Sequence, residues 1–292
     1  MKPLNYLSLL FLSFFCFIQS GQAGFYNWAK RLGDASTNID VGKSITSDKN
    51  GNVYVTGLFQ GTADFDPGNG VFNLVTAGSS QNIFFAKYNA NGNFIWAKQI
   101  GDANLSKGID IKVDDNSDVY LLADFEQSIS LDFDPGTGTG TVLGQGNKSI
   151  AFAKYDTDGN FIWAKSISGS GDCLGATLLV NSSGNIYISG AFSLVADMDP
   201  SGLTANLTAI GTNNGFFAMY NNQGSYQWAK QLTAAGGNSE IKRLTQDNVG
   251  NLYITGFYQS NCDFDPDGVA QFIRTNDGNS DFYVGCYNEF GI

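Results

Sequence analysis

One segment of about 66 residues recurs four times along this 292-residue chain, and this repetition constrains the fold more than any other feature. Its most visible marker is a Trp-Ala-Lys triplet, which contains all four tryptophans, at Trp28, Trp96, Trp163 and Trp228. A second marker, Asp-x-Asp-Pro, occurs once in each repeat and keeps the same period. Repeats of this length indicate architectures in which each unit buries its apolar surface against its neighbours.

The first 23 residues are predicted to be an export signal that lies outside the repeats. Lys2 precedes an apolar run from Leu7 to Ile18, and the small residues Gly21 and Ala23 mark a cleavage point. The run is too short for a membrane span and no stop-transfer pattern follows it. We therefore treat residues 24–292 as one exported domain of four repeats, secreted or held at the cell surface, with no membrane span.

Composition argues against several classes of function. Without the signal, 15 basic residues oppose 27 acidic ones, so nucleic acid is not an expected partner. The chain has no histidine, which removes Ser-His-Asp and Cys-His nucleophilic systems and imidazole zinc sites. Three cysteines remain, so at most one disulfide is expected within the chain. Cys262 and Cys286 share the last repeat and are the better pair, whereas the alternative is three buried thiols that include Cys173.

Within each repeat the sequence predicts short strands joined by tight turns. Residues 44–57 indicate a hairpin with a turn at Asn50 and Gly51, and residues 84–98 indicate a second hairpin with a turn at Asn91 and Gly92. Asn-Gly pairs suit such turns because both residues tolerate a positive φ. Four strands per repeat follow, joined halfway by a longer loop that carries the Asp-x-Asp-Pro marker.

Four-stranded antiparallel units repeated radially make a β-propeller, in which strands packed between neighbours are apolar on both faces. We therefore predict an all-β propeller of four blades with four antiparallel strands each. The sequence stops at the position equivalent to Gly92, so the last blade lacks its Trp-Ala-Lys strand and the N-terminus carries an extra one. Pairing of the N-terminal strand with the last blade would close the ring. A fragment of a larger propeller is the alternative.

The segment from Asp48 to Gly57, with counterparts at Asn181 to Gly190 and Asp247 to Gly256, resembles the bacterial β-propeller repeats called SBBP repeats. The resemblance covers residues 24–292 and implies a secreted or cell-surface binding scaffold. Proteins of that family are usually seven-bladed. Four units and the inserted loop depart from that pattern.

The paired aspartates of the loop recur in all four repeats, as Asp64, Asp66, Asp132, Asp134, Asp197, Asp199, Asp263 and Asp265. Identical placement argues against catalysis, because an active site normally breaks the symmetry of a propeller. In one interpretation the carboxylates accept backbone N–H groups in tight turns that proline and glycine complete. In the other, two carboxylates and loop carbonyls form a weak calcium site in each blade. No other cofactor is expected.

The Trp-Ala-Lys strand is interpreted as packing surface rather than as a sugar-binding site. Trp96 and Lys98 share one face of a strand, so the ring and the lysine stem can lie together. Lysines on an outermost strand would also deter edge-to-edge association, and a monomer is expected. Four recurring tyrosines are predicted to be core residues: Tyr54, Tyr120, Tyr187 and Tyr253.

Positions that differ between repeats carry more information about function. One position of the expected innermost strand holds, in successive repeats, Ser44, Asp110, Thr177 and Arg243. In a four-blade ring Asp110 and Arg243 would face each other across the channel, where they could pair or, with Lys112, bind a polar ligand. We predict a non-enzymatic binding or interaction scaffold for an unknown protein or glycan. The alternative is a carbohydrate-binding or glycoside-cleaving propeller that uses the channel face, by fold analogy.

Overall fold

The structure is a computed structural model that describes residues 27–33, 38–78, 80–101, 105–126, 130–267 and 271–292. All helices and strands assigned within these residues are β-strands. No helix in this described part of the chain is long and apolar enough to span a membrane. The predicted export signal, residues 1–23, lies outside the described residues.

The strands follow the four repeats. The first unit contains β1 (Val41–Ser47), β2 (Val53–Gln60), β3 (Thr62–Asp64), β4 (Asn73–Val75), β5 (Gln81–Tyr88) and β6 (Phe94–Ile100). The second contains β7 (Ser106–Val113), β8 (Val119–Glu126), β9 (Ser130–Asp132), β10 (Thr141–Leu143), β11 (Lys148–Tyr155) and β12 (Phe161–Gly169). The third contains β13 (Cys173–Val180), β14 (Ile186–Phe192), β15 (Val195–Asp197), β16 (Asn206–Thr208), β17 (Asn214–Tyr220) and β18 (Tyr226–Ala235). The fourth contains β19 (Ser239–Gln246), β20 (Leu252–Tyr258), β21 (Asn261–Asp263), β22 (Ile273–Thr275) and β23 (Asp281–Tyr287).

Each unit is built on one antiparallel sheet, in the orders β1-β2-β5-β6, β7-β8-β11-β12, β13-β14-β17-β18 and β19-β20-β23. We call β1, β7, β13 and β19 the inner strands, and β6, β12 and β18 the outer strands. The two hairpins predicted in the first repeat are confirmed, because β1 pairs with β2 and β5 with β6. Described residues of the last unit form three of the four expected strands, without an outer one.

The longer loop of each unit folds into a small hairpin that the sequence analysis did not predict. These hairpins are β3–β4, β9–β10, β15–β16 and β21–β22. They also join adjacent units, since outer strand β12 pairs with β15 of the next unit and outer strand β18 pairs with β21. At these two junctions the backbone ladder therefore continues from one repeat into the next.

Hairpin turns are held by a side chain that accepts backbone N–H groups. Asp48 Oδ1 accepts the N–H groups of Asn50 and Asn52, both at 2.9 Å. Burial opposes ionisation of Asp48, but hydrogen bonds from Asn52, Asn50 and Tyr54 outweigh it and lower the pKa of the carboxyl. Asn89 forms the same arrangement in the second hairpin of this unit. The turn residues thus specify both hairpins locally.

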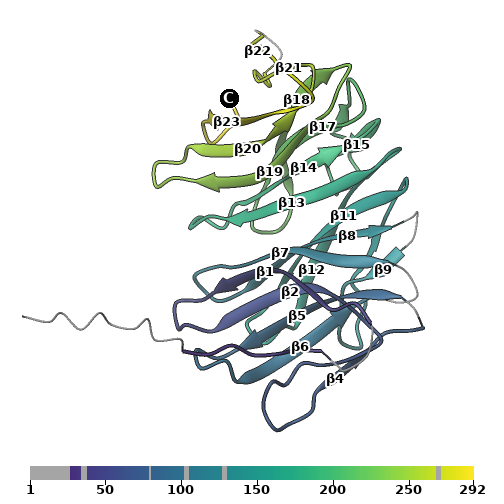
Figure 1. The fold of residues 1–292 in the computed structure, drawn as a ribbon, viewed down its shortest axis with the longest axis vertical. Coiled ribbons are helices and arrows are strands. Elements are labelled where there is room, and N and C mark those ends of the chain that lie inside the picture. The colour runs from purple at the N-terminus through teal and green to yellow at the C-terminus, as the bar shows by residue number, and fades with distance from the viewer. Residues whose placement is uncertain (1–26, 34–37, 79, 102–104, 127–129, 268–270) are drawn as a thin grey trace, which may run out of the picture.

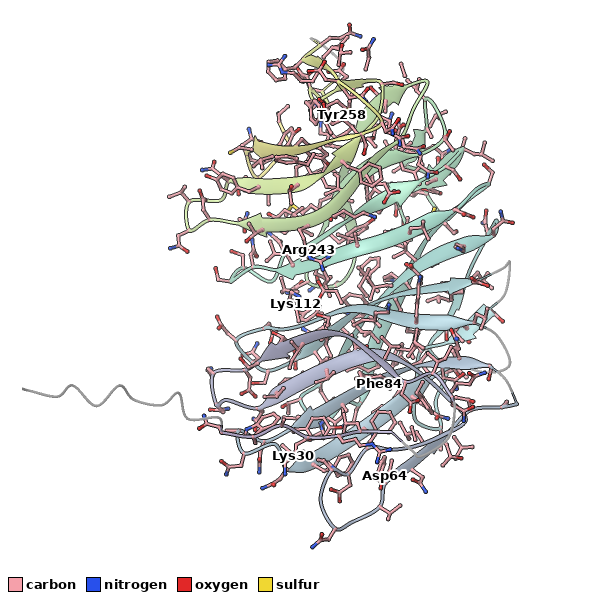
Figure 2. The ribbon with its side chains drawn as sticks, viewed as in Figure 1. Lys30, Asp64, Phe84, Lys112, Arg243 and Tyr258 are labelled. Carbon is pink, nitrogen blue, oxygen red and sulfur yellow. The ribbon has the colours of Figure 1, made fainter. Side chains whose placement is uncertain are left out.

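The units follow one another along the longest axis as an open stack, from the first unit, with β4 and β6 at one end, to the last unit, with β21 and β22 at the other (Figure 1). Residues 27–33 lie beside the first unit, where the Gly33 N–H donates to the Asp64 carbonyl at 3.0 Å. Among the described strands, β23 pairs with β20 and with no other. The predicted closure of the ring by the N-terminal strand is therefore wrong. Figure 2 shows Lys30 beside the first unit and Tyr258 in the last unit.

Apolar core fills the junctions between units. At each junction a phenylalanine from the third strand of a four-stranded sheet packs on a tyrosine of the next unit, in the pairs Phe85–Tyr155, Phe152–Tyr220 and Phe217–Tyr287. The prediction that the recurring tyrosines are core residues is confirmed for Tyr54, Tyr120 and Tyr187. Tyr253 is 38% exposed, because none of the described residues forms a unit that covers the last sheet.

The tryptophan of each Trp-Ala-Lys strand packs on a turn glycine of the following unit. A Cβ built on Gly159 would lie 3.3 Å from both the Trp96 ring and the Lys98 stem. Gly224 has the same relation to Trp163 and Lys165, with a φ of +73°. The packing interpretation is therefore supported, and the ring and lysine stem share one face.

We expect Gly224→Ala to destabilise the protein more than Gly202→Ala. Both glycines have positive φ, but a Cβ at Gly202 meets nothing within 4 Å, whereas one at Gly224 lies 2.9 Å from Lys165 and 3.0 Å from Trp163. Backbone strain alone costs about 1 kcal/mol. Overpacking should add about 1–3 kcal/mol at Gly224. Urea unfolding midpoints measure the difference, and equal losses for the two variants would contradict the proposed role of this contact.

Candidate functional site on the inner strands

The four inner strands share a β-bulge immediately before the position that varies between repeats. Their register shifts fall between Gly42 and Ser44, Gly108 and Asp110, Gly175 and Thr177, and Ile241 and Arg243. A bulge bends the strand and re-aims the following side chain, and bulges are common beside functional sites. The residues that vary between repeats thus lie directly after the β-bulge of each inner strand, where the backbone bends.

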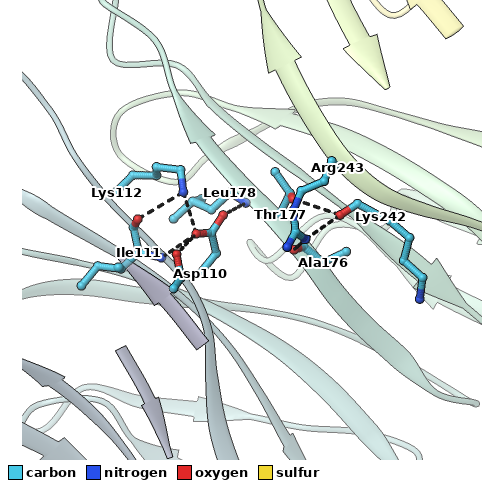
Figure 3. A network of polar contacts seen from close by, with 9 residues as sticks. Asp110, Ile111, Lys112, Ala176, Thr177, Leu178, Lys242 and Arg243 are labelled. Atoms are coloured by element: carbon cyan, nitrogen blue, oxygen red, sulfur yellow. Dashed lines mark hydrogen bonds and ion pairs between the residues drawn. The ribbon is translucent and has the colours of Figure 1, made fainter. Parts of the chain in front are cut away.

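Asp110 is buried and links three units through its carboxylate (Figure 3). One oxygen accepts hydrogen bonds from the Ser44 hydroxyl of the first unit and from Lys112 Nζ, the latter at 2.6 Å. The other accepts the Leu178 N–H of the third unit at 3.0 Å. Charge-assisted hydrogen bonds of this kind are stronger than neutral ones. Asp110 therefore contributes to the junctions, and its lysine partner stays partly exposed.

Arg243 does not form the predicted ion pair with Asp110, whose ionic partner is Lys112. The exposed Arg243 guanidinium donates instead to the carbonyls of Lys242, at 2.8 Å, and Ala176, at 3.3 Å. The described units form an open stack rather than a closed four-blade ring, so the second and fourth units do not face each other across a channel. Figure 2 shows Lys112 and Arg243 near the middle of the stack.

A cavity of about 180 Å³ opens beside these residues and is lined by the second, third and fourth units. Two ion pairs contribute to its lining, Lys107 with Asp124 at 3.7 Å and Lys242 with Glu240. The Gly175 N–H donates to Asp124 Oδ1 at 2.9 Å. Both signs of charge therefore meet in one small space on the inner strands.

Asp124 is a residue that the sequence analysis missed. It is 4% exposed, and burial raises its pKa to about 6, although the Gly175 N–H and the Lys107 charge oppose the shift. Registers with the inner strands place Leu58, Ala191 and Phe257 at its position in the other units. One carboxylate among three apolar counterparts was the signal that could have revealed it.

The aspartates of the Asp-x-Asp-Pro loops accept backbone N–H groups. Asp64 Oδ1 accepts those of Asp66 and Phe72, and Asp66 Oδ1 accepts that of Gly68. The same bonds recur at the other pairs, Asp132 and Asp134, Asp197 and Asp199, and Asp263 and Asp265. These contacts support the turn interpretation.

Calcium binding at these loops stays a prediction. Calcium needs six to eight oxygens, and each loop offers two carboxylates that already bond to the backbone. No cluster of three or more Cys, Asp or Glu side chains suited to a metal ion is found within the described ranges.

The cysteine prediction is partly corrected. Cys173, Cys262 and Cys286 are free thiols, so the Cys262–Cys286 disulfide does not form. Cys173 and Cys262 are buried, and burial raises the pKa of each thiol to about 12. Cys286 is exposed on β23, contrary to the alternative of three buried thiols.

Comparisons with known proteins agree with this architecture. The SBBP β-propeller repeat family matches residues 27–58 and 227–256. The chain is 27% identical over 221 residues to an uncharacterized WD repeat-containing protein of Acanthamoeba polyphaga mimivirus, a match over 68% of this chain and 16% of that protein. It is 26% identical over 143 residues to the regulatory protein FlaEY of Caulobacter vibrioides, a match over 47% of this chain and 14% of that protein.

The chain thus spans a small part of the length of both relatives. With the strand order described above, these matches define an all-β protein that contains β-propeller repeats. Both family matches begin beside a Trp-Ala-Lys triplet, so the repeat of the family runs from the last strand of one unit into the next unit.

We expect Asp64→Ala to lower the free energy of unfolding by about 1–3 kcal/mol, because two backbone N–H groups lose their acceptor. Asp64→Asn keeps an acceptor oxygen and should change stability by less than about 1 kcal/mol. Thermal unfolding of both variants, in excess calcium and in chelator, provides the measurement. A calcium-dependent rise in Tm that Asp64→Asn abolishes would instead establish the metal site.

Asp124→Asn should stabilise the protein above pH 6. The folded pKa of about 6 exceeds the ordinary 3.8, so the stability contributed by this carboxyl is full below about pH 4 and is lost as pH rises through 6. Asparagine stays neutral and can accept the Gly175 N–H. We expect a gain on the order of 2 kcal/mol at pH 7 that vanishes near pH 4. Urea unfolding between these pH values measures it, with exposed Asp115→Asn as the control. A pH-independent difference would contradict this assignment.

Proposed function

We propose that the protein is an exported, non-enzymatic interaction scaffold that binds a charged segment of a partner protein on its inner strands. Export rests on the predicted signal at residues 1–23. The binding role is carried by one observation: the charged cavity lies where the otherwise uniform repeats diverge from one another. Positions that recur in every repeat are used for core, turns and junctions.

The charges of this face suit a partner that carries both signs. Lys242 and Arg243 are exposed at the bulge of β19, whereas Asp124 and Glu240 contribute negative charge to the same cavity. Loop and bulge positions on a rigid β-scaffold are the usual places for binding residues. The WD repeats of the mimivirus relative are consistent with a protein partner.

Catalysis is not part of this proposal. The chain has no histidine, and its recurring carboxylate pairs are engaged with backbone N–H groups in all four units. The alternative ligand is a glycan. No contact among the described residues favours a glycan over a peptide, so both are tested in the same experiment.

An array of charged peptides, together with a panel of polysaccharides, tests the proposal. Peptides that the wild-type protein retains should lose about tenfold or more in affinity with the double variant Lys242→Ala and Arg243→Ala, since two charged contacts are removed. The matched control is Lys43→Ala and Lys49→Ala, because Lys43 holds the bulge position equivalent to Lys242 in the first unit. Retention of polysaccharides alone, or equal loss with both double variants, would overturn the proposal.

A further inference from the structure

Strands β7 and β19 carry a basic surface on an otherwise acidic chain. Together they hold four basic and two acidic residues: Lys107, Lys112, Lys242, Arg243, Asp110 and Glu240. The whole chain has 16 basic and 27 acidic residues. Strand β13 contacts both β7 and β19 and carries no charged residue. Figure 3 shows Ala176 of β13 with Lys112 of β7 on one side and Lys242 of β19 on the other. Basic residues therefore flank an uncharged strand.

Both signs of charge line this surface, but they differ in how far a partner can reach them. Three ion pairs lie on it, in which the lysine side chains are 31–55% exposed and the carboxylate side chains only 6–20%. These pairs are Lys107 with Asp124, Lys112 with Asp110, and Lys242 with Glu240. In each pair the ammonium group is the more accessible partner. The charge that a bound molecule would meet is therefore positive.

The buried carboxylates are already engaged within the chain. Asp110 accepts the Ile111 N–H at 2.9 Å in addition to its bonds to neighbouring units. Asp124 accepts the Gly175 N–H. An ammonium group has three N–H donors, so Lys242, which donates to Glu240, keeps donors for a ligand. The oxygens of an incoming carboxylate are the acceptors that suit these donors best, because charge assists such hydrogen bonds.

The cavity between these strands suits a side chain of a peptide. Its volume of about 180 Å³ is below the roughly 300–1,000 Å³ of typical small-molecule pockets. Lys107 and Lys242 line it from β7 and β19. No aromatic side chain among the described residues lines it, so a sugar ring would find no stacking surface. Its apolar lining is aliphatic and consists of Ile109, Leu174, Ala176, Ala191 and Ile241.

We propose that the charged segment bound at this site is acidic, with carboxylates next to an aliphatic residue. The carboxylates would pair with Lys107 and Lys242 while the aliphatic side chain occupies the cavity over β13. This inference rests on the function proposed above and specifies the chemistry of the partner. The acidic net charge of the chain does not oppose it, because exposed charges farther away than about 8 Å are largely screened at physiological ionic strength.

Short synthetic peptides built on Glu-Leu-Glu test this inference, with matched peptides built on Gln-Leu-Gln and Lys-Leu-Lys. We expect the protein to bind the Glu peptide about tenfold or more tightly than the Gln peptide, since only the former carries carboxylates. Fluorescence anisotropy of the labelled peptides measures the affinities. Raising the salt concentration from about 50 to 500 mM should weaken binding of the Glu peptide, because salt screens exposed charges.

Ala176 offers a test in two directions. Its bulge position is occupied by Lys43 in the first unit and by Lys242 in the fourth, so the repeat accommodates lysine there. Ala176→Lys adds an ammonium group over β13 and should strengthen binding of the Glu peptide several-fold. Ala176→Glu should weaken it about tenfold, because its carboxylate repels the peptide and competes for the lysines. Loss of folding would weaken binding in both variants.

A double variant and a matched control test the two lysines directly. Lys107→Gln with Lys242→Gln should weaken binding of the Glu peptide about tenfold or more. The control, Lys30→Gln with Lys49→Gln, removes two exposed lysines outside this surface and should bind like wild type.

The outcomes separate this inference from the proposed function. Tighter binding of the Gln or Lys peptide than of the Glu peptide, or no binding of the Glu peptide, would overturn the acidic partner. So would a change in the same direction for both Ala176 variants. If the peptide array retains only basic peptides, and the Lys242→Ala and Arg243→Ala variant loses them, the scaffold function stands and the acidic partner is wrong. If the array retains no peptide, both proposals fail.

Discussion

The packing of a tryptophan on the turn glycine of the following unit is the contact on which the rest of the structure depends. It recurs at Trp28 with Gly92, Trp96 with Gly159, Trp163 with Gly224 and Trp228 with Gly291. Only a residue without Cβ leaves room for the ring, and the turn needs a positive φ at the same residue. The contact thus couples a local backbone requirement to the placement of the next unit. Aromatic pairs between third strands reinforce each of the three junctions, and ladders between an outer strand and a small hairpin reinforce the second and third.

This construction leaves few positions for function. Residues that recur in every repeat are occupied by turns, core and junctions, as the hydrogen bonds of Asp64 and the burial of Tyr54 show. Asp110 varies between repeats, yet it also joins units through Ser44 and Leu178. The inner-strand surface proposed to bind a partner is therefore narrow, and it consists of the bulged residues of β19 and the charged cavity beside them.

Predictions from the sequence were accurate where the signal was local. Asn-Gly turns, alternating apolar residues and the period of the tryptophans were sufficient to predict the hairpins and the sheets. The small hairpins were missed because strands of three residues, such as β3 and β4, are too short to show alternation. Asp124 was missed because a single carboxylate in one repeat has no motif around it. The ion pair expected between Asp110 and Arg243 was inferred from the symmetry of a four-blade ring. It does not form, because the units are arranged as an open stack.

The sequence by itself determined the repeats, their strands and the chemistry of their turns, because these depend on residues within a few positions of one another. The tertiary structure decided how the units are placed relative to one another, which carboxylates meet which lysines, and that the first and last units lie at opposite ends of the stack. The physical reason is that the rotation between units results from many small packing contacts across each junction. No local pattern in the sequence encodes that rotation, and its sum over the units determines how the first and last units are placed relative to one another.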